Sequence, residues 1–226
     1  MNITDNPILT AEQKTFLLAF SGSELRFSFY LTGGTCLAAF YLFHRLSEDL
    51  DLFSREPVGI EPVLAFLKTL PDVVDMQYER KFDRKIFLLR QAEGRPLKVE
   101  FTTYPFQQCE KRMTVEELAI DSLKDILVNK IMAMTDRRDS KDFVDLFYAL
   151  KRNPEVSLRR LLRATEAKFG IKGVSHIIKG RFLGELPPLG GLSMREDIDY
   201  EAIARFFKDQ ALSLISEDLG PFERGL

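Results

Sequence analysis

Two aspartates separated by one residue, Asp49 and Asp51, stand in the segment DLDLF, where polar and apolar residues alternate. In a β-strand this alternation places both carboxylates on one face and Leu50 and Leu52 on the other. Paired carboxylates attract hard divalent cations, Mg²⁺ first, with Mn²⁺ as an alternative. In nucleotidyl transfer such an ion bridges phosphate oxygens and activates the attacking hydroxyl. A lone D-x-D is nevertheless more often the exposed face of an amphipathic strand.

Glu100 is the candidate for a third metal ligand. It belongs to the segment LKVEFT, whose alternation puts Lys98 and Glu100 on one face of a strand and Val99 and Phe101 on the other. A carboxylate from a neighbouring strand would complete an oxygen-rich pocket of the kind that Mg²⁺ prefers. The predicted metal ligands are therefore Asp49, Asp51 and Glu100.

A double glycine, Gly33 and Gly34, followed by Thr35, precedes the apolar segment TCLAAFYLFHRL. We expect a short strand over residues 27–31, a tight turn, and then a buried helix. Glycines at the N-terminus of a helix let backbone N–H groups approach a phosphate closely, and the helix dipole favours the anion. Taken alone, the same residues also fit a plain turn with Thr35 as a cap.

A third group of charged residues surrounds Lys130 and Arg137, which lie seven residues apart and face the same way on one unbroken helix. Together they could reach the triphosphate of a nucleotide, with Lys130 as a point charge and Arg137 as a planar fork. The other interpretation is a solvated helix in which Arg137 or Arg138 pairs with Asp142 or Asp145. For this segment in isolation the second arrangement is the more common one.

The elements that must position these residues are helices and strands in the first half of the chain and helices in the second half. Thr10 and Gln13 make a capping-box pattern before a first helix, and apolar periodicity predicts a helix over 57–70 and strands over 73–81, 85–91 and 97–102.

From Thr114, which makes a second capping-box pattern with Glu117, the apolar spacing predicts helices alone, with a break at Asn153 and Pro154, a loop over 184–191 and a last helix over 199–214. We expect an α+β fold with an α/β core in residues 1–112 and a helical region, 113–226, that completes the nucleotide site.

Composition excludes several classes of protein. The chain has 226 residues with 32 Lys and Arg against 34 Asp and Glu, so no global basic field marks a nucleic-acid partner. The two cysteines, Cys36 and Cys109, have neither metal nor disulfide spacing, which favours buried thiols in a reducing compartment. No targeting segment or long apolar run is present, so we expect a cytoplasmic protein with no membrane partner.

In this order, the motifs resemble those of the AbiEii/AbiGii-type nucleotidyltransferase toxin family, which is related to the MenT toxins and built on the polymerase-β nucleotidyltransferase fold. The family's opening pattern of a glycine turn, a helix, Arg-x-Ser and Asp-x-Asp is matched by Gly33, Gly34, Thr35, Arg45, Ser47, Asp49 and Asp51. The later helical pattern is matched by Lys130, Arg137, Lys141, Asp142, Asp145, Leu146 and Leu150. The resemblance covers residues 25–150 and joins motifs from two regions, which makes it specific.

The resemblance implies a nucleotidyltransferase-type mixed sheet and the Mg²⁺-dependent transfer of a nucleoside monophosphate from an NTP to an acceptor. The residues it implies as catalytic are Asp49, Asp51, Lys130 and Asp142, and those it implies as nucleotide-binding are Gly33, Gly34, Thr35, Arg45, Ser47, Lys130 and Arg137.

The resemblance also implies a cognate antitoxin and an acceptor such as tRNA or a protein. A tRNA would need a basic surface, for which the candidates are Arg152, Arg159, Arg160, Arg163, Lys168, Lys172, Lys179 and Arg181. Two alternatives stay open: a small-molecule acceptor such as an aminoglycoside-like alcohol, and a catalytically silent module that binds a partner protein.

Overall fold

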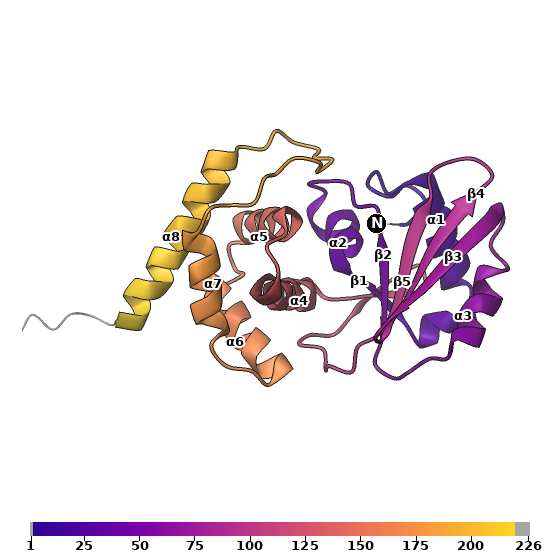
Figure 1. Cartoon of the computed structure of the whole chain (residues 1–226), viewed down its shortest axis with the longest axis horizontal. Coiled ribbons are helices and arrows are strands. Elements are labelled where there is room, and N and C mark those ends of the chain that lie inside the picture. Colours follow the sequence, from indigo (N-terminus) through magenta and orange to yellow (C-terminus); the bar gives the residue numbers. More distant parts are fainter. Residues whose placement is uncertain (1, 220–226) are drawn as a thin grey trace, which may run out of the picture. The chain divides into compact units, whose positions relative to one another are not determined.

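A mixed β-sheet organises the first part of the chain in the computed structural model, which describes residues 2–219 (Figure 1). Its strand order is β3-β4-β5-β2-β1-β7-β6. Strand β2 runs antiparallel to β1 and parallel to β5, and β1 runs parallel to β7. The strands are β1 (Tyr30–Thr32), β2 (Leu50–Ser54), β3 (Val73–Lys81), β4 (Arg84–Gln91), β5 (Leu97–Thr103), β6 (Met113–Val115) and β7 (Leu118–Ile120). The strands predicted over 73–81, 85–91 and 97–102 are thereby confirmed.

Helices make up most of the rest of the described chain. They are α1 (Ala11–Ser21), η1 (Glu24–Phe27), α2 (Gly33–Leu37), η2 (Ala38–Leu42), α3 (Ile60–Leu67), α4 (Leu123–Asp136), α5 (Ser140–Arg152), α6 (Leu158–Phe169), α7 (Val174–Leu183) and α8 (Tyr200–Leu219). The chain divides into two compact units, and the division falls between Ile126 and Leu127. The predicted functional division after residue 112 stays a prediction.

The core of the first unit lies between one face of the sheet and helices α1 and α3. Helix α1 begins with the predicted capping box, in which Thr10 and Gln13 satisfy each other's backbone N–H groups. Phe16 and Phe20 of α1 each pack edge-to-face on Phe66 of α3, with 5.5 Å between ring centroids. Phe20 also reaches Phe101 of β5. The apolar residues of the central strands therefore face α1 and α3, which leaves the opposite face for polar chemistry.

The expectation of helices alone after Thr114 is wrong for residues 113–120, which form the hairpin of β6 and β7. Its two turn residues, Glu116 and Glu117, both have positive φ, as a two-residue hairpin turn of the primed type requires. The carboxylate of the turn residue Glu116 accepts a hydrogen bond from the N–H of Ile3, 2.7 Å away, which ties the turn to the N-terminal segment. Buried Ile120 pairs with Leu31, so long-range contacts override the local capping pattern.

Two smaller expectations around the double glycine also need correction. The strand predicted over 27–31 is observed over Tyr30–Thr32, so it is shorter and begins later than expected, because residues 24–27 form a 3₁₀ turn. The apolar helix that follows is buried, as predicted, but it changes to a π-turn over Ala38–Leu42 and ends at Phe43 in the left-handed conformation. π-turns within helices are frequent at functional sites.

The second unit is helical, and its core is aromatic. Phe143 of α5 lies edge-to-face with Phe207 of α8, and Phe182 of α7 packs on the same ring. The predicted break is confirmed, because α5 ends at Arg152 and α6 begins at Leu158. Among the described residues, none of the helices has the length and apolar character needed to cross a membrane.

Candidate active site

The aspartate pair lies at the start of β2, where the predicted alternation is confirmed. Leu50 and Leu52 are completely buried, whereas Asp51 lies on the opposite face and is partly exposed. Asp49 directly precedes the strand, and its backbone carbonyl accepts a hydrogen bond from the hydroxyl of Thr35. Thr35 is fully buried. Its side chain therefore ties α2 to the start of β2 and fixes the backbone on which both carboxylates stand.

The two glycines are needed because other side chains occupy the space beside them. Gly33 has a φ of 75°, and a Cβ built on it would overlap Oδ2 of Asp51 and lie 2.8 Å from Cγ. A Cβ on Gly34 would lie 2.8 Å from Nη2 of Arg45 and 3.1 Å from Oγ of Ser47. The turn thus brings together three parts of the opening motif: the glycines, the Arg-x-Ser segment and Asp51.

Glu100 neighbours Asp51 on the sheet, because the two residues are register partners on the parallel strands β5 and β2. Side chains of such partners share a face. The Glu100 carboxylate is almost completely buried and accepts two hydrogen bonds from Arg84 and one, 2.7 Å long, from Thr102. Burial acts to raise the pKa of Glu100, but these hydrogen bonds and the charge of Arg84 outweigh it and lower that pKa. Glu100 is therefore held as an anion.

Two cations lie among these carboxylates. Lys98 Nζ is 2.7 Å from Oδ2 of Asp49, and both side chains are about 40% exposed. The pKa of Arg84 is raised mainly by its hydrogen bonds to Glu100, and further by the negative charges of Asp51 and Asp49. Arg84 is the site residue that the sequence analysis missed. Its one signal in the sequence was a charged residue directly before the strand predicted over 85–91, and only the pairing of β4 with β5 brings it to Glu100.

The site fits a divalent cation held by Asp49 and Asp51 better than one held by all three predicted ligands. Within residues 2–219, no group of three or more acidic, histidine or cysteine side chains is arranged to hold a metal ion. Mg²⁺ is usually held by one or two carboxylates together with substrate phosphates, so an aspartate pair with hard oxygen donors suffices. Glu100 as a ligand stays a prediction, and binding would require it to leave Arg84.

In the second unit, Lys130, Arg137, Asp142 and Asp145 form one ion-pair cluster. Lys130 Nζ lies 3.1 Å from Asp142 and 2.5 Å from Asp145, and both carboxylates are completely buried. Arg137 donates to Asp142 over 2.9 and 2.8 Å from Nε and Nη2. Arg137 follows the last residue of α4, and its side chain is 52% exposed. Lys130 is thus an interior structural cation, whereas Arg137 is accessible to a ligand.

The basic residues proposed for an RNA surface in the second unit are partly neutralised. Arg159 pairs with Glu217 and Asp218, Lys179 pairs with Asp218, and Arg152 pairs with Glu196. Ion pairing reduces the charge that these residues would present to a phosphate backbone.

Neither of the two cysteines is assigned to the candidate active site. Cys36 is completely buried, and burial raises the pKa of its thiol well above the ordinary value. Cys109 is only half-buried, contrary to the expectation of two buried thiols.

The α+β fold with its seven-stranded mixed sheet is shared by solved structures, among them a nucleotidyltransferase toxin. MenT4, the nucleotidyltransferase toxin Rv2826c from Mycobacterium tuberculosis H37Rv, has a TM-score of 0.57 and 15% identity over 95% of this chain and 88% of that one. JHP933 from Helicobacter pylori has a TM-score of 0.61 and 19% identity over 91% and 93%. At these identities the likeness shows the fold alone.

The chain belongs to the AbiEii nucleotidyltransferase family. The family model described as "Nucleotidyl transferase AbiEii toxin, Type IV TA system" matches residues 15–223. A relative, protein aq_aa25 of Aquifex aeolicus (strain VF5), is 30% identical over 186 residues, which make up 80% of this chain and 84% of the relative. The chain is therefore a nucleotidyltransferase of a toxin family, for which an NTP is the substrate, a divalent metal is typical and an antitoxin is the partner. The resemblance and the α+β fold class expected from the sequence are both confirmed.

Proposed function

We propose that the protein transfers a nucleoside monophosphate from an NTP to an RNA acceptor, tRNA being the first to test, in a reaction that depends on Mg²⁺. The observation that supports this most directly is the position of the Asp51 carboxylate, which lies against Gly33 on the same strand face as its register partner Glu100. A phosphate that approaches the glycine turn would meet backbone N–H groups and an ion held by the aspartates.

The site residues of the first unit have different roles in the proposed transfer. Asp49 and Asp51 would hold Mg²⁺, which would supply positive charge to the phosphates and favour deprotonation of the acceptor hydroxyl. Gly33 and Gly34 leave room for the side chains of Asp51 and Arg45, and the backbone N–H groups of the turn together with the Arg45 guanidinium donate to the triphosphate oxygens. Thr35 holds the backbone of Asp49 in place through its hydroxyl.

The ion-pair cluster of the second unit contributes both a phosphate-binding residue and positioning residues to the proposed site. Arg137 contributes its exposed guanidinium to phosphate binding, because a planar fork matches phosphate oxygens. Lys130 and Asp142 act as positioning residues, since both are buried and bound to each other.

The test uses each α-labelled NTP with Mg²⁺ and total tRNA, followed by separation of labelled RNA from labelled protein. We expect label in RNA that is lost with EDTA and in Asp51→Asn, a variant of nearly the same shape without the negative charge. Asp75→Asn is the matched control, because Asp75 is an exposed aspartate of β3 with only a 3.9 Å contact to Arg90.

The outcomes separate the alternatives. Label on protein alone would replace the RNA acceptor by a protein, and label in a small cationic alcohol added in place of RNA would favour a small-molecule acceptor. Transfer that survives in Asp51→Asn would refute the metal assignment. Absence of transfer to all of these acceptors, together with absent NTP binding in calorimetry, would leave the silent binding module.

A further inference from the structure

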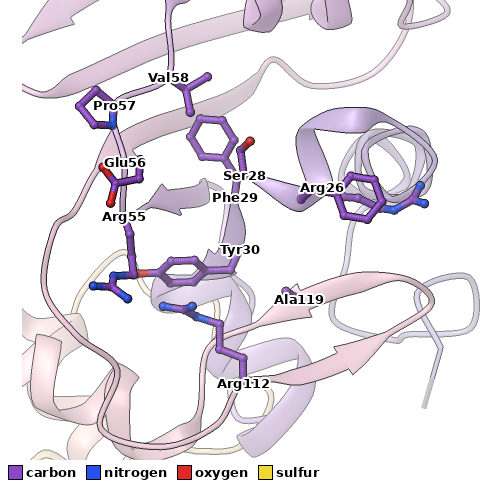
Figure 2. A pocket seen from close by; sticks show the side chains of 11 residues that line it. Arg26, Ser28, Phe29, Tyr30, Arg55, Glu56, Pro57, Val58, Arg112 and Ala119 are labelled. Atoms are coloured by element: carbon purple, nitrogen blue, oxygen red, sulfur yellow. The ribbon is translucent and has the colours of Figure 1, made fainter.

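A pocket with a volume of about 430 Å³ lies where β1 begins and β2 ends, within the size range of ligand sites. Figure 2 shows Arg26 on one side of it, and Arg55 and Arg112 near the ring of Tyr30 on the other. The lining residues include three arginines and one carboxylate, Glu56, so their summed charge is 3 − 1 = +2. The pocket also has an aromatic lining. None of the proposed catalytic or nucleotide-binding residues takes part in it.

The pocket shares a sheet face with the aspartates but lies at the other end of the strands. Tyr30 is the register partner of Phe53, two residues after Asp51 on β2, and partners on adjacent strands share a face. Arg55 follows four residues after Asp51, a separation of roughly 13 Å in an extended chain. A ligand in the pocket would therefore be separate from a metal-bound phosphate at Asp51.

The three arginines differ in how far their charges are compensated by other groups of the protein. The guanidinium of Arg112 lies 3.4 Å from the centroid of the Tyr30 ring and 3.5 Å from the buried Asp121 carboxylate, so its charge is partly compensated. Arg55 is exposed, and within residues 2–219 it forms neither a hydrogen bond nor an ion pair. Arg55 is therefore available to an anion.

Arg26 and Phe27 form the opposite wall of the pocket. Arg26 Nη1 donates to the carbonyl oxygen of Ser21 over 2.9 Å, but its buried Nε has no hydrogen-bond partner in the described chain. A buried donor without a partner is costly, and a bound acceptor would satisfy it. Phe27 is 71% exposed, which is unusual for so large an apolar ring, and the Arg26 guanidinium lies 4.4 Å from its centroid.

This lining calls for a ligand that combines an anion with a flat ring. Guanidinium groups match phosphate oxygens, and nucleobases stack on aromatic rings and on guanidinium planes. An inorganic anion would leave Phe27 exposed, and an uncharged aromatic compound would leave Arg55 without a partner. We propose that the pocket binds one nucleotide unit, a base with its phosphate, at a site separate from that of the NTP substrate. The unit belongs either to a single-stranded RNA segment or to a free nucleotide.

The test measures binding without catalysis, so its result does not depend on the proposed transfer reaction. Fluorescence anisotropy of a labelled ten-residue oligoadenylate is recorded in EDTA over a series of salt concentrations, with the full chain. Calorimetry with AMP forms the second arm. The variants are Arg55→Ala and Phe27→Ala, both at exposed side chains. The matched control is Arg205→Ala, an exposed arginine of α8.

We expect Phe27→Ala to weaken oligoadenylate binding about tenfold, because base stacking carries much of the affinity for single strands. Arg55→Ala should lower the slope of log K against log salt by about 0.7, the contribution of one phosphate contact on a single strand. Glu56→Gln should strengthen binding because it removes the carboxylate from the lining. Arg205→Ala should leave binding unchanged.

The two arms separate the sources of the nucleotide. Loss of oligoadenylate binding in both pocket variants, with no binding of AMP, supports an RNA segment, and the same dependence for AMP supports a free nucleotide. Equal affinities for the wild type, Arg55→Ala and Phe27→Ala would overturn the proposal. Binding that is lost in Asp51→Asn but not in the pocket variants would overturn it as well, because the ligand would then occupy the carboxylate site.

Discussion

Replacing Lys130 by methionine tests whether its ammonium group stabilises the second unit. The side chain is 9% exposed and contacts two completely buried carboxylates, Asp142 and Asp145. Methionine keeps most of the apolar stem but removes the charge. Removal of one partner from a buried ion pair costs about 3–5 kcal/mol, because the remaining charge is left uncompensated in the interior. Arg137 still donates to Asp142 in the variant, so we expect a loss near the lower end, about 3 kcal/mol.

Urea denaturation followed by circular dichroism measures this loss of stability. Arg137→Met is the matched control: its side chain is 52% exposed, and removal of a partly exposed ion pair should cost only about 1 kcal/mol. Adding Asp145→Asn to Lys130→Met should recover part of the loss, which a double-mutant cycle would detect as coupling. A Lys130→Met variant within about 0.5 kcal/mol of the wild type would refute the assignment of Lys130 as an interior structural cation. NTP affinity should be compared only under conditions where the variant is folded.

Further predictions concern the first unit. Gly33→Ala should cost about 1–2 kcal/mol for its left-handed φ and, by displacing Asp51, reduce transfer about 100-fold. Gly170→Ala is the matched control, because Gly170 also has a left-handed φ, 65°, but no atom within 4 Å of an added Cβ, and a fully active Gly33→Ala would contradict the proposed contact between Gly33 and Asp51. The folded state lowers the pKa of Glu100, so its contribution to stability is present above the ordinary glutamate pKa of about 4.3 and is lost as the pH falls through the lower folded value. Glu100→Gln should therefore flatten the acid side of the stability profile, and an unchanged slope would argue against the Arg84 pairing. Arg84→Met should tighten Mn²⁺ binding in a calorimetric titration, because it removes a positive charge near the aspartates and frees Glu100; weaker binding would show that Arg84 instead organises the site.

Local chemistry was enough to predict much of the first unit. The period-two alternation in DLDLF follows from burying Leu50 and Leu52, so the polar face of β2 could be predicted without the sheet. The capping box of α1 involves only neighbours in sequence, Thr10 and Gln13, and it formed as predicted. Residue identities and spacing were likewise sufficient to indicate the family.

The predictions that were wrong or missing concern residues whose structure depends on contacts with residues far away in the sequence. The Thr114 pattern fits a helix locally, but the pairing of Leu31 with Ile120 and the bond from Ile3 to Glu116 make it a hairpin. Only the register of β4 and β5 brings Arg84 to Glu100, since the two are 16 residues apart.

The charges show the same division between sequence and structure. The sequence determined which residues carry charge and, through their periodicity, which face of an element they occupy. The tertiary structure decided how those charges pair: Lys130 with Asp142 in the interior, Lys98 with Asp49 at the aspartate pair, and Arg55 with none of the described residues. The physical reason is that pairing and burial depend on distances between elements, which packing sets, whereas periodicity depends only on the geometry of one element.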